Sequence, residues 1–472
     1  MRIAAVDQGT TSTRVLVVEA DGTAAIRHAV RHAQHRPRAG WVEHDAGEVL
    51  ANVRACLLAA GAVDAIGLDN QGESCLAWES GTGEPLSPII VWQDARTAED
   101  LAALRQAGRE AESLARSGLP FDPYFSASKL AWLLRHVPAV SAAASRGALR
   151  LGTTDAFLLR HLTGRCVTDV TTASRTGLMN LASLRWDPVL CDLFGVPIEC
   201  LPAIVPSVSR FGSVAKVPLT AAVVDQQAAL FGHGCRRAGD TKITFGTGAF
   251  TLVVTGERIV QGAERGLLPT VAWQVGDAPA VRAVDGGVYD AGAAVDWAGR
   301  LGLFASHADL ERFPAAPAIS RGLAFVPALS GLACPHWDRS AAALWIGMRG
   351  DTTRQDLCQA LLEGVALRTA EVVDTLAGEV PVGEAISVDG GLASNRYFAQ
   401  FLADALGRTV VVRGLGELTA AGTAELAALG LGAELRVAGR DDRTYRPGAV
   451  DRTSWRARFA DAVAKAKGWQ PA

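Results

Sequence analysis

The chain has 472 residues, and because one hydrophobic core stops growing near about 250–300 residues, two domains are expected. Hydrophobic residues make up 49% and charged residues 20%, as in ordinary globular proteins, and the net charge of −3 gives no general attraction to nucleic acid or to an anionic membrane. No apolar run approaches the ~18–20 residues of a membrane span. The N-terminus carries Asp7 and lacks a hydrophobic core of signal-peptide length. We therefore expect a cytoplasmic protein with neither a nucleic-acid partner nor a membrane span.

The first expected elements form a strand meander. Residues 3–26, I-A-A-V-D-Q-G-T-T-S-T-R-V-L-V-V-E-A-D-G-T-A-A-I, predict a strand, a Gly/Thr turn, a second strand, an Asp-Gly turn and a third strand. A similar pattern recurs at 241–254, T-K-I-T-F-G-T-G-A-F-T-L-V-V, where a strand again enters a Gly/Thr turn and a second strand leaves it. Two such hairpins, far apart in the chain, indicate two halves with related folds.

Helices and strands alternate in the C-terminal part. Apolar residues at helical spacing predict a long helix over 353–377, followed by a strand at 385–391 and a helix at 395–407. This alternation places the chain in the α/β class. Because no long Pro/Gly linker is present, the boundary is expected in a short hinge near Cys235–Gly239, which gives domains 1–236 and 237–472.

Three Gly-rich turns at strand ends are the candidate phosphate-binding features, at 7–11, 245–250 and 388–395. Each offers backbone N–H groups without bulky side chains, and the first two add threonine hydroxyls, which suits a phosphate cradle. The common P-loop motif is absent, and no G-x-G-x-x-G follows a strand, so the sequence does not support a dehydrogenase. One such turn alone would most often be a plain hairpin, but three of them with acids nearby favour phosphate binding.

Acidic residues follow three apolar strands. Asp7, Asp225 and Asp389 end A-A-V-D, A-A-V-V-D and I-S-V-D, and open α/β sheets bind ligands beyond the carboxyl ends of their strands. Asp7 would suit a Mg²⁺ site, directly or through water, and Asp225 would suit a base that accepts a hydroxyl proton. Each aspartate could instead cap a turn or a helix, and for Asp389 the two interpretations have equal weight.

Several of these segments together carry a family resemblance. V-D-Q-G-T-T-S-T-R, I-V-W-Q-D-A-R-T, Y-F-S-A-S-K-L-A-W-L-L-R-H, T-D-V-T-T-A-S-R-T, D-Q-Q-A-A-L-F-G, F-G-T-G-A-F and V-D-G-G-L-A-S-N follow the order and spacing of the FGGY carbohydrate kinases. The chain resembles this family almost end to end, and within it the glycerol kinases. The resemblance implies two actin-like domains, each with a ribonuclease-H-like sheet, and a catalytic cleft between them.

The resemblance also implies a reaction and its participants. The family transfers the γ-phosphoryl group of ATP, with Mg²⁺, to a primary hydroxyl of a polyol or sugar, and its members are often homodimers or homotetramers. Asp225 matches the base, and Asp7 remains the candidate metal ligand. The positions that match nucleotide contacts are Thr10, Thr11, Arg14, Gly246, Thr247, Gly292, Asp296, Gly391 and Asn395. Those that match the pocket of the acceptor, the small molecule that receives the phosphoryl group, are Gly72, Glu73, Trp92, Tyr124, Asp225, Gln226 and Phe250.

The sequence departs from the glycerol kinase pattern at Gly72, in N-Q-G-E, where these enzymes carry a substrate-binding arginine. Loss of one charge-assisted hydrogen bond would cost roughly 1.5–3 kcal/mol, or about 10–150-fold in affinity. The vacated volume could admit a four-carbon polyol or a pentulose, so a kinase for a larger acceptor stays open beside glycerol as the default. Asp296 also departs from the family, which often has glutamine there. A nucleotide-binding sensor without catalysis is a further alternative, although Asp7, Thr10, Asp225 and Thr247 argue against it.

Overall fold

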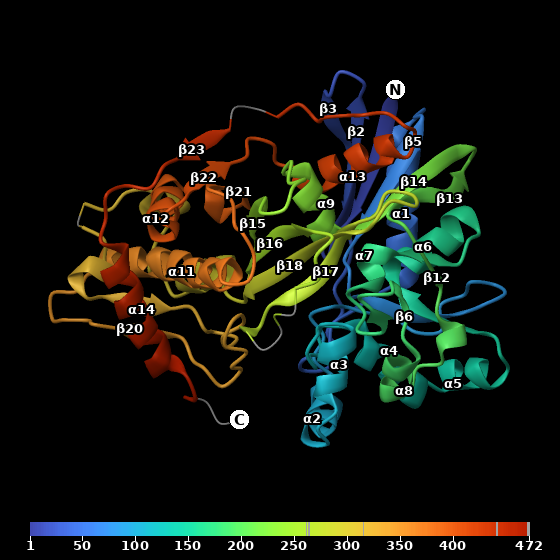
Figure 1. The fold of residues 1–472 in the computed structure, drawn as a ribbon, viewed down its shortest axis with the longest axis horizontal. Coiled ribbons are helices and arrows are strands. Elements are labelled where there is room, and N and C mark those ends of the chain that lie inside the picture. Colours follow the sequence, from blue (N-terminus) through green and yellow to red (C-terminus); the bar gives the residue numbers. More distant parts are fainter. Residues whose placement is uncertain (261, 263–264, 315, 440–441, 470–472) are drawn as a thin grey trace.

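The computed structural model describes residues 1–260, 262, 265–314, 316–439 and 442–469, and it contains two large mixed sheets (Figure 1). The first has six strands in the order β13-β14-β5-β1-β2-β3. β1 pairs antiparallel with β2 and parallel with β5, and β5 pairs parallel with β14. The strand bounds are β1 (Arg2–Gln8), β2 (Ser12–Glu19), β3 (Ala24–Arg31), β5 (Ala65–Asn70), β13 (Val208–Val214) and β14 (Val217–Val224).

The second sheet has seven strands in the order β17-β18-β16-β15-β21-β22-β23. β15 pairs antiparallel with β16 and parallel with β21, just as β1 pairs with β2 and β5. This repeated pairing confirms the two related halves predicted from the two hairpins. The strand bounds are β15 (Thr241–Phe245), β16 (Ala249–Gly256), β17 (Leu268–Trp273), β18 (Val281–Val288), β21 (Ala385–Gly390), β22 (Thr409–Val412) and β23 (Arg443–Tyr445).

The first half also contains a smaller sheet with associated helices, and this part of the chain carries several predicted site residues. It is built on a four-stranded sheet in the order β4-β7-β6-β8, and in Figure 1 its helices α2 and α3 project below the first sheet. The strands are β4 (Glu43–His44), β6 (Cys75–Glu79), β7 (Ile89–Ile90) and β8 (Leu149–Thr153). This half includes the helices α1 (Ala46–Ala60), α2 (Ala98–Gln106), α3 (Glu110–Arg116), α4 (Ser126–His136), α5 (Pro138–Ser145), α6 (Thr154–Thr163), α7 (Val170–Ala173) and α8 (Pro188–Phe194).

The second half contains the two helices expected from periodicity. α11 (Arg354–Ala377) begins with a capping box between Thr353 and Asp356, in which each side chain satisfies the other residue's backbone N–H. α12 (Arg396–Leu406) begins at Asn395 and ends at Gly407 in the left-handed conformation, which suits glycine. Other elements of this half include α10 (Gly292–Arg300), α14 (Arg452–Ala466), η5 (Leu392–Ser394), β19 (Ala324–Val326) and β20 (Leu344–Ile346). Among the described residues, no helix is both long and apolar enough to cross a bilayer.

Two helices, α9 (Asp225–Gly232) and α13 (Leu418–Leu429), pack against each other between the sheets. Gly422 makes this approach close, because a Cβ there would lie 1.9 Å from the carbonyl oxygen of Ala228. Although α13 comes late in the chain, it lies against β1 and β5 of the first sheet. One buried core therefore runs through both halves, and the domain boundary near Cys235–Gly239 stays a prediction.

Candidate active site

Three carboxylates meet at one edge of the first sheet. In the parallel register of β1 and β5, Asp7 lies beside Asp69, and β14, the next strand, ends directly before Asp225. The predicted pair Asp7 and Asp225 is therefore brought together, and Asp69 joins it. Sequence reasoning missed Asp69, although it ends the apolar strand A-I-G-L-D with the same pattern that singled out Asp7.

Asp7 and Asp69 form a buried acidic pair. Burial raises the pKa of both carboxyl groups, and the charge of Asp7 raises the pKa of Asp69 further. Oδ2 of Asp69 accepts a hydrogen bond from Oγ1 of Thr423 at 2.6 Å, whereas its buried Oδ1 has no partner among the described residues. Within the described part of the chain no cluster of three or more His, Cys, Asp or Glu side chains is placed to hold a metal. Two carboxylates nevertheless fit Mg²⁺, which usually completes its shell with waters and substrate phosphates.

The first Gly/Thr turn is tied to its neighbours by side chains. Nε1 of Trp92 donates to Oγ1 of Thr10 at 2.9 Å, which fixes the hydroxyl at the turn. Arg14 lies between two carboxylates, with its Nε 3.3 Å from Oδ2 of Asp7 and its Nη1 3.0 Å from Oε2 of Glu417. Thr11 is exposed at the tip. The turn therefore presents hydroxyl and backbone groups beside the acidic pair.

The second Gly/Thr turn is docked on the start of α10. Gly246 and Thr247 are exposed, and the backbone N–H of Gly292 donates to the carbonyl of Gly246 at 3.0 Å. Only glycine fits at 292, because a Cβ would lie 2.5 Å from the oxygen of Gly246. Three of the predicted nucleotide contacts therefore lie together.

The other predicted nucleotide contacts lie elsewhere in the second half. Asp296 is exposed on α10, and Gly391 is exposed beside η5. Asn395 uses both ends of its amide inside the protein: Oδ1 accepts from the N–H of Phe398 and Nδ2 donates to the carbonyl of Leu310, each at 2.8 Å. Each end of the amide can still form one more hydrogen bond, and the assignment of Asn395 as a nucleotide contact stays a prediction.

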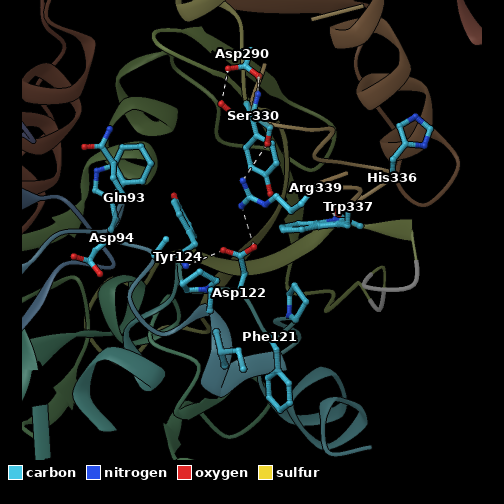
Figure 2. Close-up of a pocket in the computed structure, with 18 of the residues that line it drawn as sticks. Gln93, Asp94, Phe121, Asp122, Tyr124, Asp290, Ser330, His336, Trp337 and Arg339 are labelled. Atoms are coloured by element: carbon cyan, nitrogen blue, oxygen red, sulfur yellow. Dashed lines mark hydrogen bonds and ion pairs between the residues drawn. The ribbon is translucent and has the colours of Figure 1, made fainter. Parts of the chain in front are cut away.

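A cleft of about 930 Å³ is lined by residues of both halves (Figure 2). Trp92 and Tyr124 line it from the first half, with their rings in an edge-to-face arrangement 5.5 Å apart, and Thr247 and Phe250 line it from the second. Figure 2 also shows an ion pair across this cleft, between Asp122 and Arg339, with an N–O distance of 3.2 Å.

A second, smaller cavity adjoins the cleft at Tyr124, which lines both. Its volume of about 10 Å³ leaves room for about one water molecule. The residues that line it are Glu73, Tyr124, Arg175, Val224, Asp225, Gln226, Gln227, Leu252, Thr270 and Asp285. Four predicted acceptor residues thus share one cavity, whereas Trp92 and Phe250 line the larger cleft.

Asp225 is the titratable group best placed for proton transfer. It is the first residue of α9, and its Oδ1 accepts a hydrogen bond from the N–H of Gln226 at 2.6 Å. Burial, together with the charges of Glu73 and Asp7, raises the pKa of Asp225 to about 7. A carboxylate with this pKa is a competent proton acceptor near neutral pH. Lys242 is fully buried, and its ammonium group donates a hydrogen bond to the side-chain oxygen of Gln226, the residue after Asp225.

The space beside Gly72 is filled, so the expectation of a vacated volume there is wrong. A Cβ on Gly72 would lie 2.9 and 3.0 Å from the two methyl groups of Val224 and 3.6 Å from Cγ of Arg175. Nε of Arg175 then donates to Oε1 of Glu73 at 2.7 Å. The guanidinium next to Glu73 therefore comes from a distant segment of the chain, which is why position 72 alone did not reveal it.

Sequence reasoning also missed Arg175 and Asp285 as cavity residues. Arg175 stands in T-T-A-S-R-T, and Asp285 stands in A-V-D-G-G, the same strand–acid–glycine pattern as V-D-G-G at 388–391. The pattern around Asp285 could have been found from the sequence. The orientation of Arg175 could not, because it follows from the packing of α7 against the second sheet.

Comparison with known proteins gives consistent matches over the whole chain. The models of the N-terminal and C-terminal domains of the FGGY family of carbohydrate kinases match residues 2–232 and 241–431. The chain is 42% identical to the glycerol kinase of Thermus brockianus over 98% of each chain. Its structure resembles that of Plasmodium falciparum glycerol kinase with ADP, with a TM-score of 0.90 at 29% identity and 98% coverage of both chains. A gluconate kinase from Lactobacillus acidophilus shares the fold, with a TM-score of 0.87 at 21% identity over 99% of each chain.

Proposed function

Because the chain belongs to the FGGY family of carbohydrate kinases, we propose that it transfers the γ-phosphoryl group of ATP to a primary hydroxyl of glycerol. The observation that carries the proposal is the small cavity in which Asp225, with a pKa of about 7, lies beside Glu73 and Tyr124. Because the cavity alone has room for about one water molecule, a short polyol would extend from it into the adjoining cleft at Tyr124. Relatives such as the Thermus brockianus enzyme are glycerol kinases.

The reaction places demands on alignment and on charge. The acceptor oxygen forms a bond to the γ-phosphorus, the bond from that phosphorus to the β-phosphate oxygen breaks, and ADP leaves. Asp225 takes the hydroxyl proton, while Glu73, Tyr124 and Gln226 hold the acceptor by its remaining polar groups. Tyr124 lies between the cavity and the cleft, where it limits access of water to the reacting atoms.

The phosphate side of the reaction is supplied by both hairpins. Thr10 in the first half and Gly246 and Thr247 in the second present hydroxyl and backbone donors without large side chains. Mg²⁺, when bound, would neutralise phosphate charge, and the carboxylates of Asp7 and Asp69 are the groups that would hold it. Arg14, beside Asp7, adds a fixed positive charge at the same turn.

A panel of acceptors tests the proposal. ADP release is measured with glycerol, a four-carbon polyol and a pentulose, each over a range of concentrations with ATP and Mg²⁺. We expect the highest kcat/KM with glycerol. A higher value with a larger acceptor would refute glycerol as the substrate, and ATP binding without phosphorylation of any acceptor would support the non-catalytic alternative instead.

A further inference from the structure

A buried charged triad forms part of the wall of the cavity that Asp225 also lines. Arg175, with 4% of its surface exposed, bridges Glu73 and Asp285: its Nε lies 2.7 Å from Oε1 of Glu73 and its Nη2 lies 3.4 Å from Oδ2 of Asp285. Arg175 follows α7 in the first half, whereas Asp285 belongs to β18 in the second. The triad therefore joins the two halves inside the cavity.

One carboxylate oxygen of the triad accepts no hydrogen bond from the described residues. Asp285 is buried, with 7% of its surface exposed, and its Oδ1 has no hydrogen-bond partner among the described residues. Oε1 of Gln227, which lines the same cavity, is also buried without a partner in the described part of the chain. Buried acceptors of this kind cost free energy unless a donor reaches them, and a ligand hydroxyl in the cavity is such a donor.

We propose that Arg175 and Asp285 determine acceptor specificity by binding adjacent hydroxyls of the polyol, an inference that rests on the proposed phosphorylation of glycerol. A hydroxyl can donate to Oδ1 of Asp285 and accept from the guanidinium of Arg175 at once. Asp225 faces the hydroxyl that reacts, and the triad binds the rest. The ligand class is therefore a short polyol with neighbouring hydroxyls, closed in by Val224 and Leu252.

Acceptors that lack one hydroxyl test this directly. The measured quantity is the ratio of kcat/KM for glycerol to kcat/KM for 1,3-propanediol, which lacks the middle hydroxyl, and for 1,2-propanediol, which lacks one terminal hydroxyl. In the wild type at least one ratio should be on the order of 10–100, because that diol leaves a buried charged group unpaired. In Asp285→Asn, and in Arg175→Lys, that ratio should fall to about three or less.

A matched control is the ion pair between Arg236 and Glu425, 2.7 Å apart and outside the cavity. Glu425→Gln should leave both ratios at their wild-type values, and thermal unfolding should show that every variant folds. An Asp285→Asn enzyme that keeps the wild-type ratios would overturn the inference, because a purely structural role lowers turnover of all acceptors alike.

The outcome also separates this inference from the proposed function. If the wild type phosphorylates glycerol but the ratios do not respond to Asp285→Asn, only the inference fails. If the wild type binds glycerol in calorimetry, Asp285→Asn weakens that binding and no acceptor is phosphorylated, only the proposed function fails. If the wild type neither binds nor phosphorylates glycerol, both fail.

Discussion

At the scale of single residues, the contact between Gly72 and Val224 explains why no side chain stands at position 72. Gly72→Ala would place a Cβ 2.9 Å from a Val224 methyl group in a packed interior, and we expect a loss of about 1–3 kcal/mol in the free energy of unfolding. Val224→Ala should relieve that clash, so the double variant should be less destabilised than the sum of the two single variants. Denaturant unfolding measures all three.

The control for this cycle is Gly350→Ala, since a Cβ at Gly350 meets nothing within 4 Å. Its unfolding free energy should stay close to that of the wild type. Strictly additive effects of Gly72→Ala and Val224→Ala would contradict the close contact between these two positions.

The raised pKa of Asp225 predicts a pH dependence. A base accepts a proton only in its ionised form, and burial raises the pKa of this carboxyl group to about 7. As pH falls below about 7, kcat/KM for glycerol should therefore fall about tenfold per unit, and above that pH it should level off. The initial rate of ADP release at low glycerol and saturating ATP measures the profile. A rate that is flat down to about pH 5.5 would contradict a pKa near neutrality.

At the scale of elements, the packing of α9 on α13 positions two of the three carboxylates. α9 begins with Asp225, and α13 carries Thr423, which donates to Asp69. Gly422→Ala would push a Cβ to 1.9 Å from the Ala228 oxygen and force the helices apart. We expect about 3 kcal/mol or more of lost stability together with a lower kcat. Gly416→Ala, where a Cβ meets no atom within 4 Å, is the matched control and should behave like the wild type.

The elements differ in how well the sequence predicted them. The two hairpins and α11 follow from local patterns of alternation, turn residues and helical spacing, so their positions were predictable. The position of α13 on the first sheet was not, because it depends on contacts such as Gly67 against Thr423, far apart in the chain. Asp225 and Glu73 were predictable from strand ends and family motifs. The interaction between Arg175 and Asp285 was not, because these two residues are far apart in the chain and only the three-dimensional structure brings them together.

At the scale of the whole molecule, the acceptor cavity takes residues from both halves, so binding there should stabilise the entire fold. A ligand at 100 times its Kd adds about 2.7 kcal/mol to the free energy of unfolding when only the folded state binds it. Glycerol and ADP should each raise Tm in differential scanning calorimetry. Asp285→Asn should reduce the shift with glycerol but keep the shift with ADP, and equal loss of both shifts would argue against a role confined to the acceptor.

Phosphorylation of glycerol by this protein depends on Asp225 as the base. The most direct test measures glycerol-dependent ADP release, and ADP binding by calorimetry, for the wild type and for Asp225→Asn. The wild type should convert glycerol and ATP to glycerol phosphate and ADP. In Asp225→Asn we expect kcat to fall by about 10²–10⁴-fold while the Kd for ADP changes little. An Asp225→Asn enzyme with near wild-type turnover would contradict the role of Asp225 as the base, and a wild type inactive on glycerol would contradict the proposed reaction.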